Sequence, residues 1–268
     1  MIGVIGAGAM GGAMTVQLAR AGNAVTIFAT PFDRPFVEAH VKGEPHPALG
    51  VHLPDDVTIV EPDSWGDVLP DADVLVLAVT TVGLVDTVRA VVSNVSPRCL
   101  FAIATKGWDE ETLRSAAQMV GDEIGDDRVV AVVGPSLANE IAAGVPTAVV
   151  CASASAHAAR RIAELLQSKR FRTYTSDDVI GVEVGAIMKN VVAIGVGMCE
   201  GLAPAFGVET MTNAKAFVFS RGLVEMAKLA RVLGGRAETI LGLAAPATCT
   251  SPWQAGATAV SAGWSAVG

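Results

Sequence analysis

Short runs of β-branched and other apolar residues alternate with longer segments of mixed polarity through the first two-thirds of the chain. Runs that are apolar throughout indicate strands buried on both faces, as in a mainly parallel sheet covered by helices. Strands are expected near residues 2–5, 24–28, 73–79, 99–104, 129–133, 147–151 and 171–174. Helices are expected over 10–21, 82–93, 110–124 and 156–166. The pattern predicts an α/β fold with a Rossmann-type doubly wound sheet.

The strand pattern gives way to helix after residues 175–178, whose Thr-Ser-Asp-Asp sequence is typical of an N-cap followed by an acidic first turn. Two long apolar helices are expected over 179–201 and 208–233. We therefore expect two domains, 1–176 and 177–268, of which the second is small and all-helical. Because such a thin helical layer buries little by itself, we expect it to complete its core against a second copy, in a homodimer.

Composition and charge argue against a disordered, a nucleic-acid-binding or a membrane protein. With 51% apolar and 17% charged residues, the chain of 268 residues can bury a large core, which excludes disorder. Its formal net charge is -8 and its basic residues are scattered, so no nucleic-acid partner is expected. The predicted strands are too short to span a bilayer, and the first residues lead directly into a strand. We therefore expect a cytoplasmic protein that does not contact membranes.

The four cysteines are far apart and form no CxxC or Cys/His ligand spacing. They are Cys99, Cys151, Cys199 and Cys249. Three of them lie in apolar stretches, so buried thiols are expected rather than disulfides. The sequence predicts no bound metal.

A glycine-rich turn follows the first predicted strand and opens the first predicted helix. Its residues are Gly6-Ala7-Gly8-Ala9-Met10-Gly11. In this context Gly6 permits a tight turn, Gly8 lets the backbone approach a pyrophosphate, and Gly11 lets the helix pack on the strand. A helix N-terminus favours the negative charge of phosphates. The turn predicts a nicotinamide dinucleotide, NAD or NADP, bound by Gly6, Gly8, Ala9, Met10 and Gly11.

The end of the second predicted strand bears on the choice of cofactor. NAD enzymes usually carry an Asp or Glu there for the ribose hydroxyls, whereas this chain runs Phe28-Ala29-Thr30-Pro31. Thr30 and Arg34 are able to accept a 2′-phosphate, which slightly favours NADP. The alternative is that Arg34 is an ordinary solvated residue.

Two lysines are candidates for catalysis. Lys106 ends a buried strand, at the edge where open α/β sheets bind ligands. Lys189 lies among apolar residues of a predicted helix, where a cation is costly unless it faces a cleft or a partner such as Glu183. If both converge on a carbonyl, one is suited to be the general acid/base and the other to stabilise the alkoxide. A structural ion pair is the alternative for Lys189.

Gly134-Pro135-Ser136 follows another strand and precedes a helix expected over 137–142. The backbone and hydroxyl of this segment are suited to binding an anion or a carbonyl oxygen. Ser136 is also suited to be the N-cap of that helix, with Glu140 nearby. Both roles can coexist.

Several segments together resemble the NAD(P)-dependent glycerol-3-phosphate dehydrogenase family, over about residues 1–252. Besides the glycine-rich turn they are TKG at 105–107, GPS at 134–136, AxE at 138–140, PTAVV at 146–150, YTSDDVIGVEVG at 174–185, KN at 189–190, NAxA at 213–216 and SRGLVEMAKL at 220–229. The resemblance implies hydride transfer between a nicotinamide and a small, anionic hydroxy or keto substrate.

The same resemblance implies roles for individual residues. Lys189 corresponds to the catalytic proton carrier, and Lys106 contacts both the substrate and the cofactor. Ala138 lies against the nicotinamide side of the cofactor. Substrate contacts are implied for Lys106, Gly134, Ser136, Lys189, Asn190, Asn213, Thr250 and Ser251.

The chain also departs from that family and ends earlier than its members do. Its loop over 242–256 is short and lacks an aspartate, and Ala255-Gly256 stands where the family has an Arg-Asn pair that holds the substrate phosphate. Thr80-Thr81 replaces prolines that follow the fourth strand of the family. Cations that remain for an anion are Lys106, Lys215 and Arg221. We therefore expect the substrate to be glycerol 3-phosphate, dihydroxyacetone phosphate or a retargeted analogue.

The sequence leaves two alternative functions. One is a non-catalytic dinucleotide-binding relic or sensor in which Lys106 and Lys189 are only structural. The other is a reductase of the pyrroline-carboxylate or 3-hydroxyacid type, which the TKG, GPS and MKN segments fit poorly.

Overall fold

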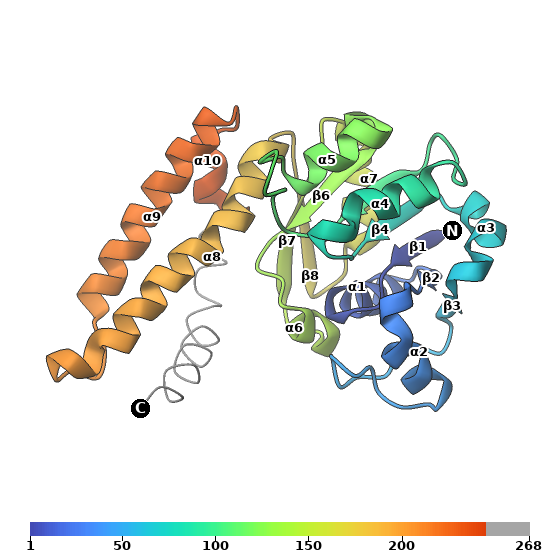
Figure 1. The fold of residues 1–268 in the computed structure, drawn as a ribbon, viewed down its shortest axis with the longest axis horizontal. Helices are drawn as coiled ribbons and strands as arrows, with labels where there is room; N and C mark the ends of the chain where they lie inside the picture. The colour runs from blue at the N-terminus through green and yellow to red at the C-terminus, as the bar shows by residue number, and fades with distance from the viewer. Residues whose placement is uncertain (245–268) are drawn as a thin grey trace. The chain divides into compact units, whose positions relative to one another are not determined.

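The computed structural model describes residues 1–244. It divides into two compact units, Met1–Val179 and the residues from Ile180 onward. In Figure 1 the first unit is a sheet covered by helices, and the second consists of helices. The predicted α/β fold with a helical C-terminal region is confirmed.

The first unit is built on one eight-stranded sheet in the order β3-β2-β1-β4-β5-β6-β7-β8. The strands are β1 (Ile2–Ile5), β2 (Val25–Phe28), β3 (Thr58–Val60), β4 (Val74–Leu77), β5 (Leu100–Ile103), β6 (Val129–Val133), β7 (Thr147–Ala152) and β8 (Phe171–Ser176). All neighbours are parallel except β6 and β7. Sequence analysis missed β3, because its three residues are only partly buried and form no apolar run.

Helices cover both faces of this sheet. They are α1 (Ala9–Arg20), α2 (Arg34–Val41), α3 (Trp65–Val68), α4 (Thr81–Val92), α5 (Ala116–Ile124), α6 (Ala138–Ala143) and α7 (Ala156–Leu166). Helices α1, α6 and α7 pack together, and α4 packs with α5. Met14 of α1 and Ile141 of α6 share one buried cluster with Val4 and Val130 of the sheet. The connection from β1 leads to β2 and the connection from β4 leads to β5, so the two move across the sheet in opposite directions. Because both crossovers are right-handed, α1 and α4 lie on opposite faces.

Helix α1 holds the ends of its two neighbouring helices. The Arg20 guanidinium donates hydrogen bonds to the carbonyl oxygens of Ile141 (2.8 Å) and Ala142 (2.5 Å). These carbonyls belong to the last turn of α6, and the Ile141 oxygen also accepts from the amide of Gly144 (2.9 Å), so Arg20 adds to the cap of this helix. One turn earlier, buried Gln17 donates from Nε2 to the carbonyl oxygen of Leu166 at the end of α7 (2.8 Å).

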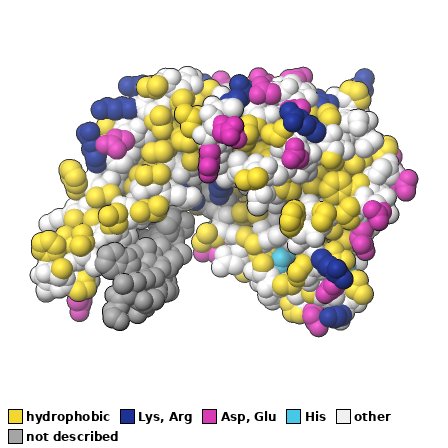
Figure 2. All heavy atoms as spheres, viewed as in Figure 1, with side chains coloured by type: hydrophobic (Ala, Val, Ile, Leu, Met, Phe, Trp, Pro, Cys, Tyr) yellow, Lys and Arg dark blue, Asp and Glu magenta, His cyan; other side chains and the backbone are white. Residues whose placement is uncertain are grey.

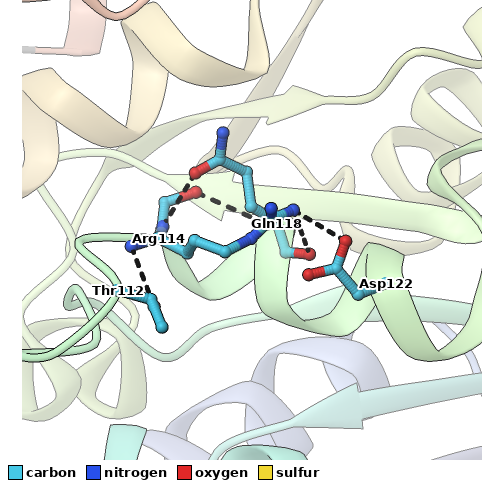
Figure 3. A network of polar contacts seen from close by, with 5 residues as sticks. Thr112, Arg114, Gln118 and Asp122 are labelled. Carbon is cyan, nitrogen blue, oxygen red and sulfur yellow. Dashed lines mark hydrogen bonds and ion pairs between the residues drawn. The ribbon is translucent and has the colours of Figure 1, made fainter.

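Helix α5 begins at Ala116, so the prediction of helix from residue 110 is wrong. Ser115 and Gln118 form a capping box, in which each side chain accepts a hydrogen bond from the backbone amide of the other. This box starts the helix at Ala116, and Arg114 just before it reaches along α5 to Asp122 (2.7 Å; Figure 3). The polar residues before Ala116 form turns instead of a helix.

The second unit contains α8 (Val179–Leu202), α9 (Thr212–Val232), the short α10 (Ala237–Thr239) and a π-helical turn (Ile240–Ala244). A 3-10 turn at Ala203–Phe206, which contains Pro204, ends α8 and is followed by Gly207 in the left-handed conformation. Exposed hydrophobic side chains are frequent along α8 and α9 (Figure 2). They include Val191, Ile194, Met198, Leu202, Phe217, Val224 and Val232.

The start of α8 differs from the prediction. Because the helix begins at Val179, Asp177 and Asp178 precede it, and its first turn holds no acidic residue. The Asp178 amide instead donates to the hydroxyl of Ser176 (3.1 Å).

One segment among the described residues, Val179–Phe206, is long and apolar enough to cross a membrane, with a mean hydropathy of 1.8. Core helices of soluble proteins pass the same test of length and composition. Half of its most apolar stretch is buried inside the protein.

Burial makes two cysteine thiols unreactive. Cys99, Cys151 and Cys199 are free and buried, whereas Cys249 lies outside the described residues. Burial raises the pKa of the Cys99 and Cys151 thiols to about 12. Since the thiolate is the nucleophile, alkylation of both at mildly alkaline pH should be at least about 100-fold slower in the folded protein than in urea. Mass spectrometry of the two peptides measures the rates, and equal rates in both states would contradict this prediction.

Candidate active site

The turn between β1 and α1 has the geometry of an anion-binding helix N-terminus. Gly6 has a φ of +91°, in the left-handed region that favours glycine, and its amide donates to the carbonyl oxygen of Phe28 (3.1 Å). Gly8 is the N-cap of α1, where no side chain caps the helix and no acidic residue lies in the first turn. The positive end of the helix dipole is therefore not neutralised by a side chain at this exposed residue.

Two glycines of this turn differ in their surroundings. A Cβ on Gly11 would overlap the carbonyl oxygen of Gly6, so only glycine lets α1 pack this closely on the turn. A Cβ on Gly8 would meet nothing within 4 Å. The open space at Gly8 and the uncapped amides of α1 fit the pyrophosphate of a dinucleotide, as the sequence predicts.

The end of β2 carries no acid, as the sequence shows, but a buried carboxylate, that of Asp33, lies in the turn that follows. Asp33 is 9% exposed, and its Oδ2 accepts hydrogen bonds from the amide and from the hydroxyl of Thr30 (2.7 Å each). The two residues form a capping box around one 3-10 turn, Pro31–Asp33. The Thr-x-x-Asp spacing in the sequence is typical of such a box and could have indicated this contact. Arg34 follows, with its side chain 83% exposed and paired with Glu38 (2.9 Å).

The loops after β5 and β6 bring Lys106 and Ser136 together. Lys106 Nζ donates to Ser136 Oγ (3.4 Å), and Ser136 Oγ donates to the carbonyl oxygen of Gly134 (3.1 Å). The N-cap of α6 is Leu137, without a side-chain cap, so the predicted capping role of Ser136 is wrong. The hydroxyl turns back to Gly134 and Lys106 instead. Ala138 is the first residue of α6 and is half-buried.

Two threonines that sequence analysis did not assign to the site hold the Lys106 loop. Thr105 Oγ1 donates to the carbonyl oxygen of Val79 (2.7 Å), and Thr81 Oγ1 donates to that of Lys106 (3.3 Å). These bonds tie the loop after β5 to the loop after β4. The sequence identifies Thr81 only as a replacement for a proline of the family. Because a threonine hydroxyl can donate a hydrogen bond and a proline ring cannot, that replacement was the feature of the sequence that could have indicated this contact.

The other candidate residues belong to the second unit or lie beyond the described residues. Lys189 on α8 is 8% exposed, whereas Asn190 on α8 and Asn213 on α9 are exposed. Thr250 and Ser251 lie outside the described residues, as does the segment with Ala255 and Gly256. Within residues 1–244, no cluster of three or more His, Cys, Asp or Glu side chains is placed to hold a metal ion.

A second buried lysine of this unit is held by a carboxylate. Lys215 Nζ donates to Glu200 Oε1 and to Thr210 Oγ1 (2.6 Å). The hydrogen bond from Lys215 holds the pKa of Glu200 below its usual range. Arg221 pairs with Glu225 at the surface (3.0 Å). Two of the three cations proposed as anion partners from the sequence, Lys215 and Arg221, therefore already have carboxylate partners.

Comparison with known proteins places this arrangement in one family. Residues 1–159 match the model of the NAD-dependent glycerol-3-phosphate dehydrogenase N-terminus, and residues 178–259 match the model of its C-terminus. The chain belongs to the NAD-dependent glycerol-3-phosphate dehydrogenase family. The resemblance carried by the sequence motifs is thereby confirmed.

Individual glycerol-3-phosphate dehydrogenases are similar over most of the chain. The NADP(+)-dependent glycerol-3-phosphate dehydrogenase of Archaeoglobus fulgidus is 33% identical over 247 residues, which cover 91% of this chain and 73% of the relative. The NAD(P)+ glycerol-3-phosphate dehydrogenase of Symbiobacterium thermophilum is 36% identical over 245 residues, covering 90% and 68%. The crystal structure of the Coxiella burnetii glycerol-3-phosphate dehydrogenase superimposes with a TM-score of 0.79 at 30% identity, covering 93% of this chain and 74% of that one.

Gly8 and Gly11 form a matched pair for testing the turn. Gly11→Ala should lower the free energy of unfolding by about 2–3 kcal/mol, because its Cβ would overlap the Gly6 carbonyl oxygen. Gly8→Ala should change it by less than about 0.5 kcal/mol, since the space around Gly8 is open. The same methyl group should nevertheless weaken NADH and NADPH binding about tenfold by occupying the space beside the turn.

Urea denaturation and fluorescence titration measure these two effects separately. Equal losses of stability in the two variants would contradict the packing argument. Unchanged cofactor affinity in Gly8→Ala would contradict the assignment of the open space to the pyrophosphate.

Proposed function

We propose that this chain is an NAD(P)-dependent dehydrogenase that interconverts glycerol 3-phosphate and dihydroxyacetone phosphate, or a close analogue of that pair. The observation that carries the proposal is the meeting of Lys106 with Ser136 on the same sheet as the glycine-rich turn, in a chain of this family. In open α/β sheets ligands bind outside the carboxyl ends of the strands, where these loops lie. The nicotinamide would supply the hydride that the carbonyl carbon gains on reduction, and the carbonyl oxygen gains a proton.

The residues of the chain have distinct proposed roles. The amides of the glycine-rich turn hold the pyrophosphate. Lys106 Nζ donates to the Ser136 hydroxyl, and a substrate oxygen can accept from Lys106 in the place of that hydroxyl. Lys189, a buried residue of α8, donates the proton to the carbonyl oxygen. Asn190, Asn213, Thr250 and Ser251 stay predicted substrate contacts.

Two cations that the sequence offers for the substrate phosphate already form ion pairs within the protein. Lys215 and Arg221 are paired with Glu200 and Glu225. Ala255-Gly256 also stands where the resembled family has its Arg-Asn pair. We therefore propose that phosphate adds less to substrate affinity here than in a relative with that pair, because charge-assisted contacts are lost. A non-catalytic role is not supported, since the relatives are dehydrogenases.

Steady-state oxidation of NADH or NADPH with dihydroxyacetone phosphate tests the proposal. Lys189→Met should lower kcat by about 10²–10⁴-fold while leaving the Kd for cofactor unchanged, as expected for a positioned proton donor. Lys106→Met should also raise KM for the substrate. Lys228→Met removes an exposed lysine of α9 and is the matched control.

Near-normal turnover in Lys189→Met would show that the proton comes from another group. A protein that binds the cofactor but reduces neither dihydroxyacetone phosphate nor small ketones and aldehydes would instead favour the non-catalytic alternative.

We propose that the chain accepts both cofactors with a slight preference for NADPH. The negative charge of Asp33 would repel the 2′-phosphate of NADPH, and the positive charge of Arg34 would attract it. The Asp33 carboxylate is already hydrogen-bonded twice by Thr30, which reduces its repulsion of an anion. Arg34 is held only by an exposed ion pair with Glu38, which contributes little, so a phosphate can displace that partner.

Substitution of the two charges should separate the cofactors. Arg34→Gln should weaken NADPH binding about 5–10-fold and leave NADH binding within about twofold, because only NADPH carries the extra phosphate. Asp33→Asn should shift the preference toward NADPH by a similar factor. Titration of each variant with both cofactors measures the ratio, and parallel changes for NADH and NADPH would contradict the assignment.

We further propose a cytoplasmic homodimer. The exposed hydrophobic side chains of α8 and α9 support self-association, because an apolar surface of this kind gains by leaving water (Figure 2). Sedimentation of the purified protein as a monomer, or its recovery with membranes after fractionation, would contradict this proposal.

A further inference from the structure

His46 connects an irregular surface segment to the glycine-rich turn. It lies between α2 and β3, is 4% exposed, and packs its ring against Phe36 with the ring centroids 4.9 Å apart. Its Nε2 is 2.9 Å from the carbonyl oxygen of Ala7, and its Nδ1 is 3.1 Å from the amide nitrogen of Ala48. One ring nitrogen therefore contacts a hydrogen-bond acceptor of the backbone, and the other contacts a hydrogen-bond donor.

These contacts determine which nitrogen carries the proton. The Ala48 amide can only donate, so Nδ1 must accept with its lone pair. The Ala7 carbonyl oxygen can only accept, so Nε2 must donate. The neutral Nε2–H tautomer is the one form of the ring that makes both hydrogen bonds.

The bond to Ala7 also orients the next amide. In a planar trans peptide the carbonyl of Ala7 and the N–H of Gly8 point in opposite directions. Since the Ala7 carbonyl points toward His46, the Gly8 N–H points away from it. Among the hydrogen bonds of residues 1–244 the Gly8 amide donates none, and the space beside Gly8 is open.

The approach of the ring to the turn depends on a second glycine. A Cβ on Gly12, in the first turns of α1, would lie 2.7 Å from two atoms of the His46 ring. The absence of a side chain there lets the imidazole reach under the turn to Ala7. Ala7 itself is flanked by two glycines, Gly6 and Gly8, whose backbone is intrinsically free to rotate. An external hydrogen bond is therefore needed to hold this peptide in one orientation.

We propose that His46 is a positioning residue for the cofactor: it fixes the Ala7–Gly8 peptide so that the Gly8 N–H faces the pyrophosphate of NAD(P). This inference rests on the proposed function, in particular on cofactor binding at the turn. The imidazole does not touch the cofactor in this role. It raises affinity by preorganising a donor that would otherwise sample other orientations.

Two substitutions at residue 46 separate the two hydrogen bonds. His46→Gln can place an amide nitrogen near the position of Nε2 and keep the donor to Ala7, but it loses the acceptor for Ala48. His46→Asn can place an oxygen near the position of Nδ1 and keep the acceptor for Ala48, but it is too short to reach Ala7. His52→Asn, at an exposed histidine of the same segment, is the matched control.

Cofactor affinity and turnover should respond differently. His46→Asn should raise Kd and KM for NADH and NADPH about 5–10-fold, the worth of one well-placed hydrogen bond, while kcat at saturating cofactor stays within about twofold. His46→Gln should restore Kd to within about twofold of the unchanged protein. Thermal unfolding of all variants identifies any that fail to fold, and the comparison is made between variants of similar midpoint.

Three results would overturn the inference. They are unchanged cofactor affinity in His46→Asn, equal weakening in His46→Asn and His46→Gln, and a loss confined to kcat. Failure of the unchanged protein to bind either cofactor would overturn the proposed function itself, which distinguishes that failure from failure of the role of His46.

Discussion

Neighbouring parallel strands of one sheet, of which β1, β4 and β5 end at the same level, determine where the candidate residues of the first unit lie. Ile5 of β1 pairs in register with Leu77 of β4, and Leu77 pairs with Ile103 of β5. The chain leaves each strand at the same edge of the sheet, so the loops that follow must be neighbours. Hydrogen bonds of Thr81, Thr105 and Lys106 then join the loop after β5 to the loops after β4 and β6. The chemistry of this edge follows from strand direction before any side chain is considered.

Sequence analysis found the features that depend on local pattern or on fold rules. The buried strands are apolar on both faces, so their positions and the doubly wound fold could be predicted from runs of residues such as Val129–Val133. Lys106 and Ser136 could be singled out because they follow such runs. The contact between them is added by the structure, and it agrees with the rule that the carboxyl ends of adjacent parallel strands share an edge.

Features that depend on the direction of one side chain could not be predicted. The sequence allows Ser136 both to cap α6 and to face a ligand, and its hydrogen bonds with Gly134 and Lys106 show that it does not cap the helix. Asp33 lies at the end of a 3-10 turn, beyond the end of β2 where NAD enzymes usually carry their acidic residue. His46 lies far from Ala7 in sequence, and no periodicity links the two positions. Such contacts arise from the path of irregular segments, which residue patterns do not encode.

Arg20 gives the site a mechanical property that neither loop has alone. Helix α1 starts at the glycine-rich turn and α6 starts just after Ser136, while the guanidinium joins the far ends of the two helices. The glycine-rich turn and the loop of Ser136 are therefore connected twice, once through the strands of the sheet and once through the far ends of the helices that follow them.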